Sequence, residues 1–533
     1  MIGAQYVHDH VMHFYHLHAL DWVDVVSALS ANPTATADLS KANNPNYKPN
    51  NGALPNAAYF QAVLAKLNSG LVNRGQLGIF SNGYWGHPAY KLSPEQNLLL
   101  LSHYLEALAW AREVVKLHTV FGGKDPHPNL VVGGMPCTLS TNTGAVTEDK
   151  GGTSLNTAGF AVIKTAIAKM KAFTDQVYLP DVLLVAQRYR EWANYGVTAG
   201  NFLSYGDFPD PTKVRKEFTD GAIDYPAGYI FPQGVIWSTN PTSLVAFNPA
   251  LVTENVAHAW YGGTASAVHP SNGTTVLNYT GPQPNDDGNT PYMLNEADRY
   301  SWIKSPRYNG KPMEVGPLAH ILAMHARNTL ATDKLVRGYV QTYWTNTATQ
   351  GGLGLAFSKL NSTLGRIFCR ALETKIIADK MADTLANGGW YERYYSNKSG
   401  PYWNPQTFTR LAQPATWPKD AKGIRGVGFG FTEAPRGALG HWVKLNQTTG
   451  KIDNYQCVVA SQWNAGPRDG DNVEGPYERA LVGHVLADIK RPLEVLRTIH
   501  SFDPCIGCAV HIVDPDGNSL VEVDINHVGR SAC

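Results

Sequence analysis

The chain has 533 residues, enough for a large buried core, and its 44 Lys and Arg against 43 Asp and Glu give a formal charge of +1. This balance excludes the basic surface that nucleic acids and anionic lipids select, so we expect neither as a partner. Charged residues make up 16 % of the chain, against about 25 % in ordinary soluble domains, while 13 Trp, 26 Tyr and 17 Phe offer much area to bury. Such a composition indicates a globular chain that covers part of its surface with a partner.

The sequence gives no sign of a membrane span or an export signal. Its longest purely aliphatic run, residues 98–101, is far shorter than the roughly 18 apolar residues that a span requires. The residues after Met1 show neither the basic nor the apolar region of an export signal, so we expect another chain to carry any export. Six cysteines are too few for a disulfide scaffold at this length.

Helices dominate the predicted elements. The clearest begins at Ser93, which can cap it, while Pro94 suits the first helical position and Gln96 completes a capping box. Apolar residues then cover much of its circumference to about residue 117, as expected of a helix inside a bundle. The last predicted helix should end at Asn387-Gly388 in the manner of a C-cap. The same apolar pattern predicts helices over 160–173, 316–331 and 368–385.

Strands are expected mainly in the second half of the chain. Between about 200 and 310, Pro, Gly, Asn and aromatic residues predict long ordered loops with short strands. The β-prone segments 441–445 and 452–459 flank residues 446–450, and we expect them to form a hairpin. The sequence therefore predicts an α+β fold, predominantly helical, with a central bundle of long helices and peripheral short β-sheets and long loops. No linker divides it, so we expect one unit without separable domains.

Two closely spaced cysteines stand near the end of the chain, in Asp503-Pro504-Cys505-Ile506-Gly507-Cys508-Ala509-Val510-His511. Thiolates two residues apart can converge on one soft or borderline metal ion, which lowers their pKa from about 8.5 so that both bind deprotonated. A structural zinc site would need two further ligands, and Ala509 stands where a covalent haem motif needs His. The spacing alone leaves metal binding, redox chemistry and a structural role open.

Long blocks along nearly the whole chain occur in the order of a known family. They are His8-Asp9-His10 continuing to Asp21-Trp22, Gly75-Gln76-Leu77-Gly78, Val131-Val132-Gly133-Gly134 with Pro136-Cys137, Tyr300 to Arg307, Glu314-Val315-Gly316-Pro317-Leu318, Ser362-Thr363-Leu364-Gly365-Arg366, Ala434-Pro435-Arg436-Gly437 and His500-Ser501-Phe502. In these blocks the chain resembles the large subunit of nickel-iron hydrogenases, most closely the membrane-associated respiratory uptake group. The resemblance implies the large-subunit hydrogenase fold.

The resemblance also implies a metal centre. In this family a nickel ion lies in four cysteine thiolates, two of which bridge to an iron that carries carbon monoxide and cyanide, and H2 is split there. By resemblance, Cys505 is a terminal nickel ligand and Cys508 a bridging ligand. Because a thiolate shared by two metals retains little basicity, Cys505 is the candidate base for the proton from H2.

A charged canopy over that centre is implied as well. The resemblance places Arg436 over the open face of the metal pair. Asp503 and Asp9 would fix its guanidinium, because the planar fork of Arg suits two carboxylates better than Lys does. Pro435 would shape the same canopy. Since the pKa of Arg normally exceeds about 12, positioning and electrostatic preorganisation is the expected role of Arg436.

Three further positions match residues around the family's cofactor. Ser461 matches a hydroxyl that donates a hydrogen bond to an iron-bound cyanide, although Ala460 stands where proline is usual. His511 and the carbonyl of Cys457 resemble ligands of a hydrated magnesium or similar ion. The five histidines from His8 to His18 match a helix without a metal of its own, so we expect them to form hydrogen bonds near the active site and the subunit interface.

The chain departs from the family pattern at both ends. The other two nickel ligands of the family lie in an Arg-x-Cys-Gly-x-Cys motif upstream of the His8 block, and these residues do not contain it. A gating glutamate and a magnesium carboxylate belong to the same segment. We expect an N-terminal truncation rather than an inactive relative. Residues 512–533 match the tail that a maturation endopeptidase removes, which predicts a catalytic unit over 1–511.

The resemblance predicts the catalytic large subunit of an uptake hydrogenase, which splits H2 into protons and electrons. Its implied partner is an iron-sulfur small subunit in an obligate heterodimer or a dimer of heterodimers, which passes electrons to a membrane cytochrome b or quinone-linked acceptor. The implied location is the periplasmic side of the cell membrane, reached through the partner's export signal. Two other hypotheses stay open: a non-catalytic hydrogenase-like scaffold of an electron-transfer complex, and a structural protein that binds zinc without nickel or iron.

Overall fold

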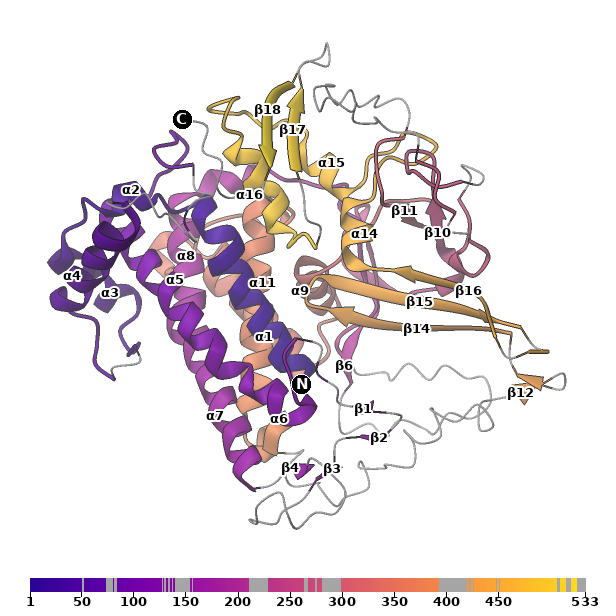
Figure 1. Cartoon of the computed structure of the whole chain (residues 1–533), viewed down its shortest axis with the longest axis horizontal. Helices are drawn as coiled ribbons and strands as arrows, with labels where there is room; N and C mark the ends of the chain where they lie inside the picture. The colour runs from indigo at the N-terminus through magenta and orange to yellow at the C-terminus, as the bar shows by residue number, and fades with distance from the viewer. Residues whose placement is uncertain are drawn as a thin grey trace.

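The structure, a computed structural model, describes most of the 533 residues. Described are residues 1–49, 52–72, 80, 84–126, 128, 131–132, 135–136, 138–139, 154–155, 157–209, 229–262, 267–273, 276–279, 299–392, 419–420, 423–424, 426–446, 448–449, 451–505, 509–513 and 519–524. Long helices form one side of the molecule, and short, mostly antiparallel sheets form the other (Figure 1). The predicted α+β, predominantly helical fold is confirmed. No described helix combines the length and apolarity that crossing a membrane demands.

The helices and strands alternate irregularly along the chain. The helices are α1 Ile2–Met12, α2 Val25–Ala28, α3 Pro33–Asn43, α4 Ala57–Lys66, α5 Pro94–Val114, α6 Lys116–Gly122, α7 Thr157–Phe173, α8 Leu179–Arg188, α9 Pro317–Arg327, α10 Ala331–Tyr339, α11 Thr363–Ala382, α14 Ala460–Ala465, α15 Pro476–Leu481 and α16 Leu493–Ser501. The strands are β1 Val131–Val132, β2 Met135–Pro136, β3 Thr138–Leu139, β4 Ser154–Leu155, β5 Phe202–Ser204, β6 Asp207–Pro209, β7 Tyr229–Phe231, β8 Gly234–Trp237, β9 Asn240–Val245, β10 Val252–Asn255, β11 Ser305–Tyr308, β12 Lys419–Asp420, β13 Gly423–Ile424, β14 Val427–Ala434, β15 Gly437–Leu445, β16 Ile452–Val458, β17 Ala509–Val513 and β18 Ser519–Asp524.

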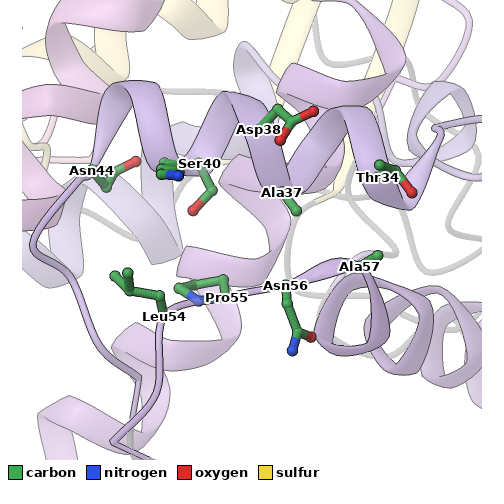
Figure 2. A pocket seen from close by; sticks show the side chains of 10 residues that line it. Thr34, Ala37, Asp38, Ser40, Asn44, Leu54, Pro55, Asn56 and Ala57 are labelled. Atoms are coloured by element: carbon green, nitrogen blue, oxygen red, sulfur yellow. The ribbon is translucent and has the colours of Figure 1, made fainter.

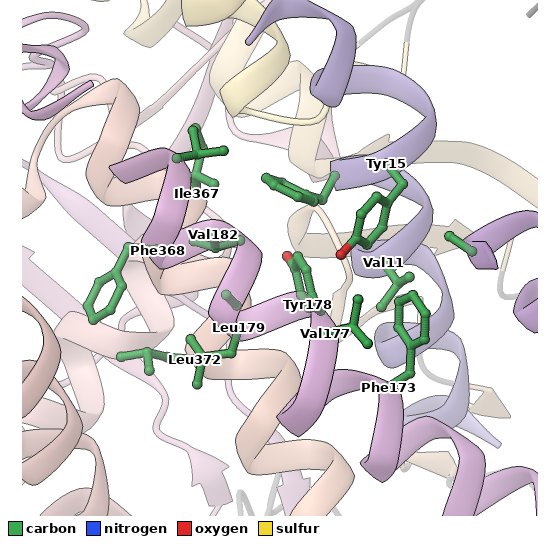
Figure 3. Close-up of a cluster of buried hydrophobic side chains, with 14 of the residues drawn as sticks. Val11, Tyr15, Phe173, Val177, Tyr178, Leu179, Val182, Ile367, Phe368 and Leu372 are labelled. Atoms are coloured by element: carbon green, nitrogen blue, oxygen red, sulfur yellow. The ribbon is translucent and has the colours of Figure 1, made fainter. Parts of the chain in front are cut away.

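The helical side packs around α11, which is buried along most of its length and contacts α1, α7, α8, α9 and α16. Figure 3 shows part of this core, where Val11 and Tyr15 from the N-terminal helical segment lie near Tyr178, and Phe368 and Leu372 extend from α11. Because α11 is covered on all sides, any charged residue on it needs a buried partner.

Local signals account for the start of α5 and for the end of α9. The side chain of Ser93 accepts from the backbone N–H of Gln96, and the Gln96 side chain accepts in return, so the predicted capping box is confirmed. The helix predicted over 316–331 is confirmed as α9, but it ends earlier than predicted. α9 ends at Arg327 because Asn328 adopts a left-handed backbone (φ 49°), and α10 starts after it.

The prediction that Asn387-Gly388 caps the helix over 368–385 is wrong. α11 begins earlier, where the Ser362 side chain accepts from the backbone of Gly365, and it ends at Ala382 because the next residue leaves helical geometry. Gly388, with a φ of 75°, ends a separate short 3-10 turn, Leu385–Asn387.

The predicted hairpin over 441–445 and 452–459 is confirmed, because β15 pairs with β16 in an antiparallel register that sets His441 opposite Cys457. The sequence analysis missed β14, which adds a third strand on the other side of β15. Sheet residues surround a second cluster of buried apolar side chains, in which Trp442 of β15 lies with apolar residues of β5, β8, β10 and α14.

A buried arginine anchors α16 to the start of the chain. Arg497 is completely buried, and its guanidinium carbon lies 4.6 Å from the ring centre of Trp22, 4.9 Å from that of Tyr189 and 5.1 Å from that of Trp192. Its Nε donates to the backbone carbonyl of Asp21 at 2.6 Å. Aromatic faces and a backbone carbonyl thus compensate this charge. We call Trp22, Tyr189 and Trp192 the aromatic cage of Arg497, and it fixes the helix that precedes the cysteine motif.

We expect Arg497→Lys to lower the free energy of unfolding by about 2–3 kcal/mol, because an ammonium cannot stack on these rings or reproduce the guanidinium hydrogen bonds. Thermal and urea unfolding of the assembled protein measure the loss. The matched control is Arg491→Lys, since Arg491 forms an exposed pair with Asp488 at 2.8 Å and should cost less than about 0.5 kcal/mol. Equal losses of unfolding free energy in the two variants would contradict the stabilising role of the aromatic cage.

Candidate functional site

A tight turn between β14 and β15 presents Arg436. Only Pro435 and Arg436 connect the two strands. Pro435 is buried, whereas the Arg436 side chain is 31 % exposed. The Nη1 atom of Arg436 lies 3.7 Å from Oδ2 of Asp9, and its Nε lies 3.3 Å from Oδ1 of Asp503. The structure therefore brings together Arg436 and both carboxylates that the sequence analysis assigned to it.

The backbone at Asp503 is held in an unusual conformation. Asp503 is 2 % exposed and has a φ of 59°, a left-handed value that costs about 1 kcal/mol or more for a residue other than glycine. Its N–H donates to the carbonyl of His500 at 3.0 Å. The carbonyl of Ser501, two residues before Asp503, accepts from Nη1 of the buried Arg370 at 2.8 Å. The turn that leads into Cys505 is thus fixed from α11.

The local charges keep Arg436 cationic. Burial opposes its charge, but Asp503, Asp9 and Cys505 attract it, and together they raise the pKa of Arg436 above its usual value. This attraction comes from the ionised form of Cys505, whose sulfur therefore lies within electrostatic reach of the guanidinium. The turn between β14 and β15 therefore holds a permanent positive charge beside a thiol.

Cys505 and Ser461 also lie together. Cys505 is exposed, and its N–H donates to Oγ of Ser461 at 3.3 Å. This contact uses the hydroxyl oxygen as an acceptor and leaves the Ser461 O–H available to a third group. Ser461 lies in α14, which is fixed because the Asn464 side chain both accepts from and donates to the backbone of Val315, each at 3.1 Å.

The other predicted metal ligands are placed only in part. Cys508 lies outside the described residues. His511 lies in β17, opposite Glu522 of β18, and its side chain is not described. Cys457 is exposed on β16, with Sγ 3.9 Å from Nε2 of His441, and burial followed by Glu254 raises the pKa of its thiol. The pairing of His511 with the Cys457 carbonyl around an ion stays a prediction.

These side chains fit one flank of a thiolate-bound metal group. Cys505 offers an exposed thiol, Arg436 a positive charge that suits the anionic ligands of such a group, and Ser461 a hydroxyl donor. Among the described residues, no three His, Cys, Asp or Glu side chains are arranged around one ion position. A complete metal shell therefore needs donors beyond the described residues, and Cys508 is one candidate.

A buried chain of ionisable side chains, missed by the sequence analysis, runs beneath the turn. His10 Nε2 lies 3.0 Å from Glu373 Oε1, Glu373 Oε2 lies 2.8 Å from His320 Nδ1, and His320 Nε2 lies 2.9 Å from Glu433 Oε2. All four side chains are completely buried or nearly so. A sequence signal existed, because ionisable residues in otherwise apolar helices need partners.

His320 is the cation of this chain. Burial opposes its charge, but Glu433 and Glu373 stabilise it and raise the pKa of His320 to about 10. Burial would raise the pKa of Glu373, yet His320 and His10 lower it to about 2. His320 also stacks on Phe231, with ring centres 4.9 Å apart. It is thus a buried imidazolium between two carboxylates.

Asp207 lies near this chain at the start of β6, where its Oδ1 accepts from the N–H of Phe208 at 2.7 Å. Burial, followed by repulsion from Glu433, raises the pKa of Asp207 from 3.8 to about 6. Between these pH values the folded chain keeps a proton that the unfolded chain releases, so stability falls as the pH rises from 3.8 through about 6.

We therefore expect Asp207→Asn, which removes this charge, to raise the free energy of unfolding by about 2 kcal/mol near pH 8 and to change it little near pH 4. Urea unfolding at the two pH values measures the difference. An equal change at both pH values would contradict the assignment, since the effect would then not come from ionisation.

The histidines of the first helical segment bind separate partners, which confirms the predicted hydrogen bonds. Two of them, His13 and His18, reach backbone carbonyls of α16, so they help to fix the helix before Cys505. The contacts are His8 with Asp9, His10 with Glu373, His13 with the His500 carbonyl, His16 with the Tyr104 carbonyl and His18 with the Arg497 carbonyl.

A pocket of about 280 Å³ lies apart from this site, between α3 and the segment that leads into α4 (Figure 2). Its lining mixes small apolar residues with Asp38, Ser40, Lys41 and Asn44, and it includes no cysteine or histidine. Nothing in that lining matches the chemistry around Arg436, so the candidate site stays at the turn.

The chain matches known proteins along nearly its whole length. The sequence profile of the nickel-dependent hydrogenases matches residues 1–511. The chain is 41 % identical to the uptake hydrogenase large subunit of Bradyrhizobium diazoefficiens, across 98 % of this chain and 81 % of that protein. It is 40 % identical to the hydrogenase-1 large chain of Escherichia coli, across 98 % and 82 %.

A solved structure has the same fold. The nickel-iron-selenium hydrogenase of Desulfovibrio vulgaris Hildenborough superposes with a TM-score of 0.60 at 25 % identity, across 96 % of this chain and 80 % of that one. A profile match over residues 1–511 and relatives at 40–41 % identity both extend far beyond the local motifs. The chain therefore belongs to the large subunits of the nickel-dependent hydrogenases, of the uptake and hydrogenase-1 type.

Proposed function

We propose that this chain is the catalytic large subunit of a nickel-iron uptake hydrogenase, which cleaves H2 heterolytically into protons and electrons. The observation that carries the proposal is the convergence of Arg436, Asp503 and Asp9 beside the exposed thiol of Cys505. These groups come from three segments far apart in the chain. An ordinary surface ion pair would not need an aspartate that is buried, adopts a left-handed backbone and lies two residues before a free thiol, as Asp503 does.

The cofactor would be a nickel-iron centre with carbon monoxide and cyanide on the iron. Cys505 would bind nickel as a terminal ligand, Cys508 would bridge the two metals, and Ser461 would donate its free O–H to a cyanide. When bound, this centre supplies the cleavage of H2. A terminal thiolate at Cys505 would accept the proton, because it is more basic than a thiolate shared by two metals.

Arg436 would act as a fixed charge rather than as a proton carrier. Its raised pKa keeps the guanidinium protonated at any working pH, and Asp503 and Asp9 hold it in place. A positioned cation beside an anionic metal group stabilises developing charge without reorganisation during the reaction. Pro435, buried at the same turn, limits where the Arg436 backbone can lie.

A second ion completes the proposal. Magnesium or a similar divalent ion would bind the His511 side chain and the carbonyl of Cys457, with waters filling the remaining positions. The structure describes the Cys457 backbone, on β16, next to the buried side chain of Gln456, which accepts from Lys304 at 3.0 Å.

The partners follow from the family. The chain would form an obligate heterodimer, or a dimer of such heterodimers, with an iron-sulfur small subunit that accepts the electrons. A membrane cytochrome b or quinone-linked acceptor would lie beyond it, on the periplasmic side of the cell membrane. A maturation endopeptidase would cut after His511 and leave 1–511 as the catalytic unit. β17 extends across that position, so cleavage would divide the hairpin of β17 and β18.

Elemental analysis of the complex between the small subunit and the full-length large subunit, with the upstream cysteine motif present and the tail removed, tests the function directly. We expect nickel in about one equivalent per large subunit, together with hydrogen-dependent reduction of an artificial dye. Zinc without nickel would instead identify a structural zinc protein. The absence of both nickel and activity would contradict the assignment as an enzyme and leave only shared ancestry.

A further inference from the structure

We propose that α9 is the element that positions Arg436, and that His320 and the glycine pair Gly316 and Gly437 are its positioning residues. The inference rests on the proposed role of Arg436. Figure 1 shows α9 between α11 and the ends of β14 and β15, where the turn that carries Arg436 lies. Two independent contacts join α9 to that turn.

The first contact is between backbones. Gly316, directly before α9, has a φ of 112°, and a Cβ placed on it would lie 2.8 Å from the carbonyl oxygen of Arg436. Gly437, directly after Arg436, has a φ of 122°, and a Cβ on it would lie 2.5 Å from the backbone nitrogen of Gly316. Both separations are shorter than any van der Waals contact, so only glycine allows this approach. The start of α9 therefore abuts the residue that bears the guanidinium.

The second contact is an ion pair one helical turn further on. His320 Nε2 lies 2.9 Å from Oε2 of Glu433, three residues before Arg436, and both side chains are completely buried. The other carboxylate oxygen of Glu433 accepts from the backbone N–H of Tyr205. The Glu433 side chain thus fixes β14 one residue before the strand ends, while the two glycines fix the backbone directly after Arg436.

The same imidazole is linked, through Glu373, to His10, the residue that follows Asp9 in α1. His320 Nδ1 bonds to Glu373 of α11 at 2.8 Å, and Glu373 bonds to His10 at 3.0 Å, next to Asp9 in α1. One cation therefore ties the segment of Arg436 and the segment of Asp9 to the same central helices. The contacts of Arg436 with Asp503 and Asp9 are long for ion pairs, at 3.3 and 3.7 Å, so its placement needs this backbone support in addition to the two carboxylates.

Hydrogen exchange of the assembled protein tests the positioning without relying on turnover. We expect His320→Gln to speed amide exchange in the peptide around residues 433–438 by about tenfold, because the buried ion pair that closes this region is lost. Glu433→Gln is the milder variant, since it keeps the pair of His320 with Glu373, and it should act in the same direction. The matched control is His325→Gln on the same helix, where the imidazole packs on Phe357 at 4.4 Å instead.

Turnover then links the position to the chemistry. We expect both variants to keep nickel and to lose about tenfold in hydrogen oxidation, and His320→Gln to add little in an Arg436→Lys background, since the two changes affect one interaction. Unchanged exchange around 433–438, or faster exchange with full turnover, would overturn the inference. Additive losses in the double variant would also overturn it. If Arg436→Lys alone keeps full turnover, the proposed function of Arg436 fails, whereas the exchange result still reports on α9.

Discussion

Arg436→Lys is expected to retain nickel and iron while hydrogen oxidation falls by about a hundredfold. Lysine keeps the positive charge, so the ions of the site should remain bound. It cannot, however, place one nitrogen beside Asp503 and another beside Asp9, which the planar guanidinium does at 3.3 and 3.7 Å. The charge would therefore lose its fixed position. Metal analysis and hydrogen-dependent dye reduction on the same preparation separate the two effects.

The matched control for this change is Arg468→Lys. Arg468 also places its Nε 3.3 Å from a carboxylate oxygen, and its side chain is 37 % exposed, but its partner is Glu478 rather than Asp503 or Asp9. The same substitution in nearly the same geometry should leave turnover within about twofold, as expected of an exposed ion pair. Unchanged turnover in Arg436→Lys, or an equal loss in both variants, would contradict the role of Arg436.

Cys505→Ser is expected to abolish both nickel binding and hydrogen oxidation. A hydroxyl is a far weaker ligand than a thiolate for a borderline metal, and its pKa leaves it protonated where the thiol ionises. The fold should survive, because Cys505 is exposed and its backbone N–H, not its side chain, bonds to Ser461. Elemental analysis of the purified complex together with thermal unfolding measures both points.

The control here is Cys369→Ala in α11. Cys369 is completely buried in the helical core, and burial raises the pKa of its thiol well above the usual value, so it stays a neutral packing residue. Its substitution should cost about 1 kcal/mol of stability and leave the nickel content unchanged. If the Cys505→Ser variant retained nickel, Cys505 would not be a nickel ligand.

The elements that the sequence predicts correctly are those set by local chemistry. The capping box at Ser93 and the hairpin around residues 446–450 depend on side chains within a few positions of one another. The errors arise where one signal permits two outcomes. Asn328 takes the left-handed conformation that ends α9, a role Asn shares with Gly, whereas Gly388 ends a short turn rather than the long helix.

The candidate site shows a similar division. Arg436, Asp503 and Asp9 were brought together only through resemblance to a family, because no periodicity relates positions at opposite ends of a chain. The link from His10 to Glu373 spans 363 residues, and Glu433 lies in a strand that alternation did not reveal. Such a network becomes visible only when the fold places buried charges against one another. The sequence gives the weaker hint that an ionisable residue in an apolar helix needs a partner.

The cage around Arg497 has a consequence for the order of assembly. The last described helix before the cysteine motif rests on Trp22, Asp21 and the histidines near them, and the contact of Arg497 with Asp21 joins positions 476 residues apart. A ribosome therefore has to add these 476 residues before the contact can form. The backbone that carries Cys505 can reach its final place only after that step, on helices that were synthesised much earlier.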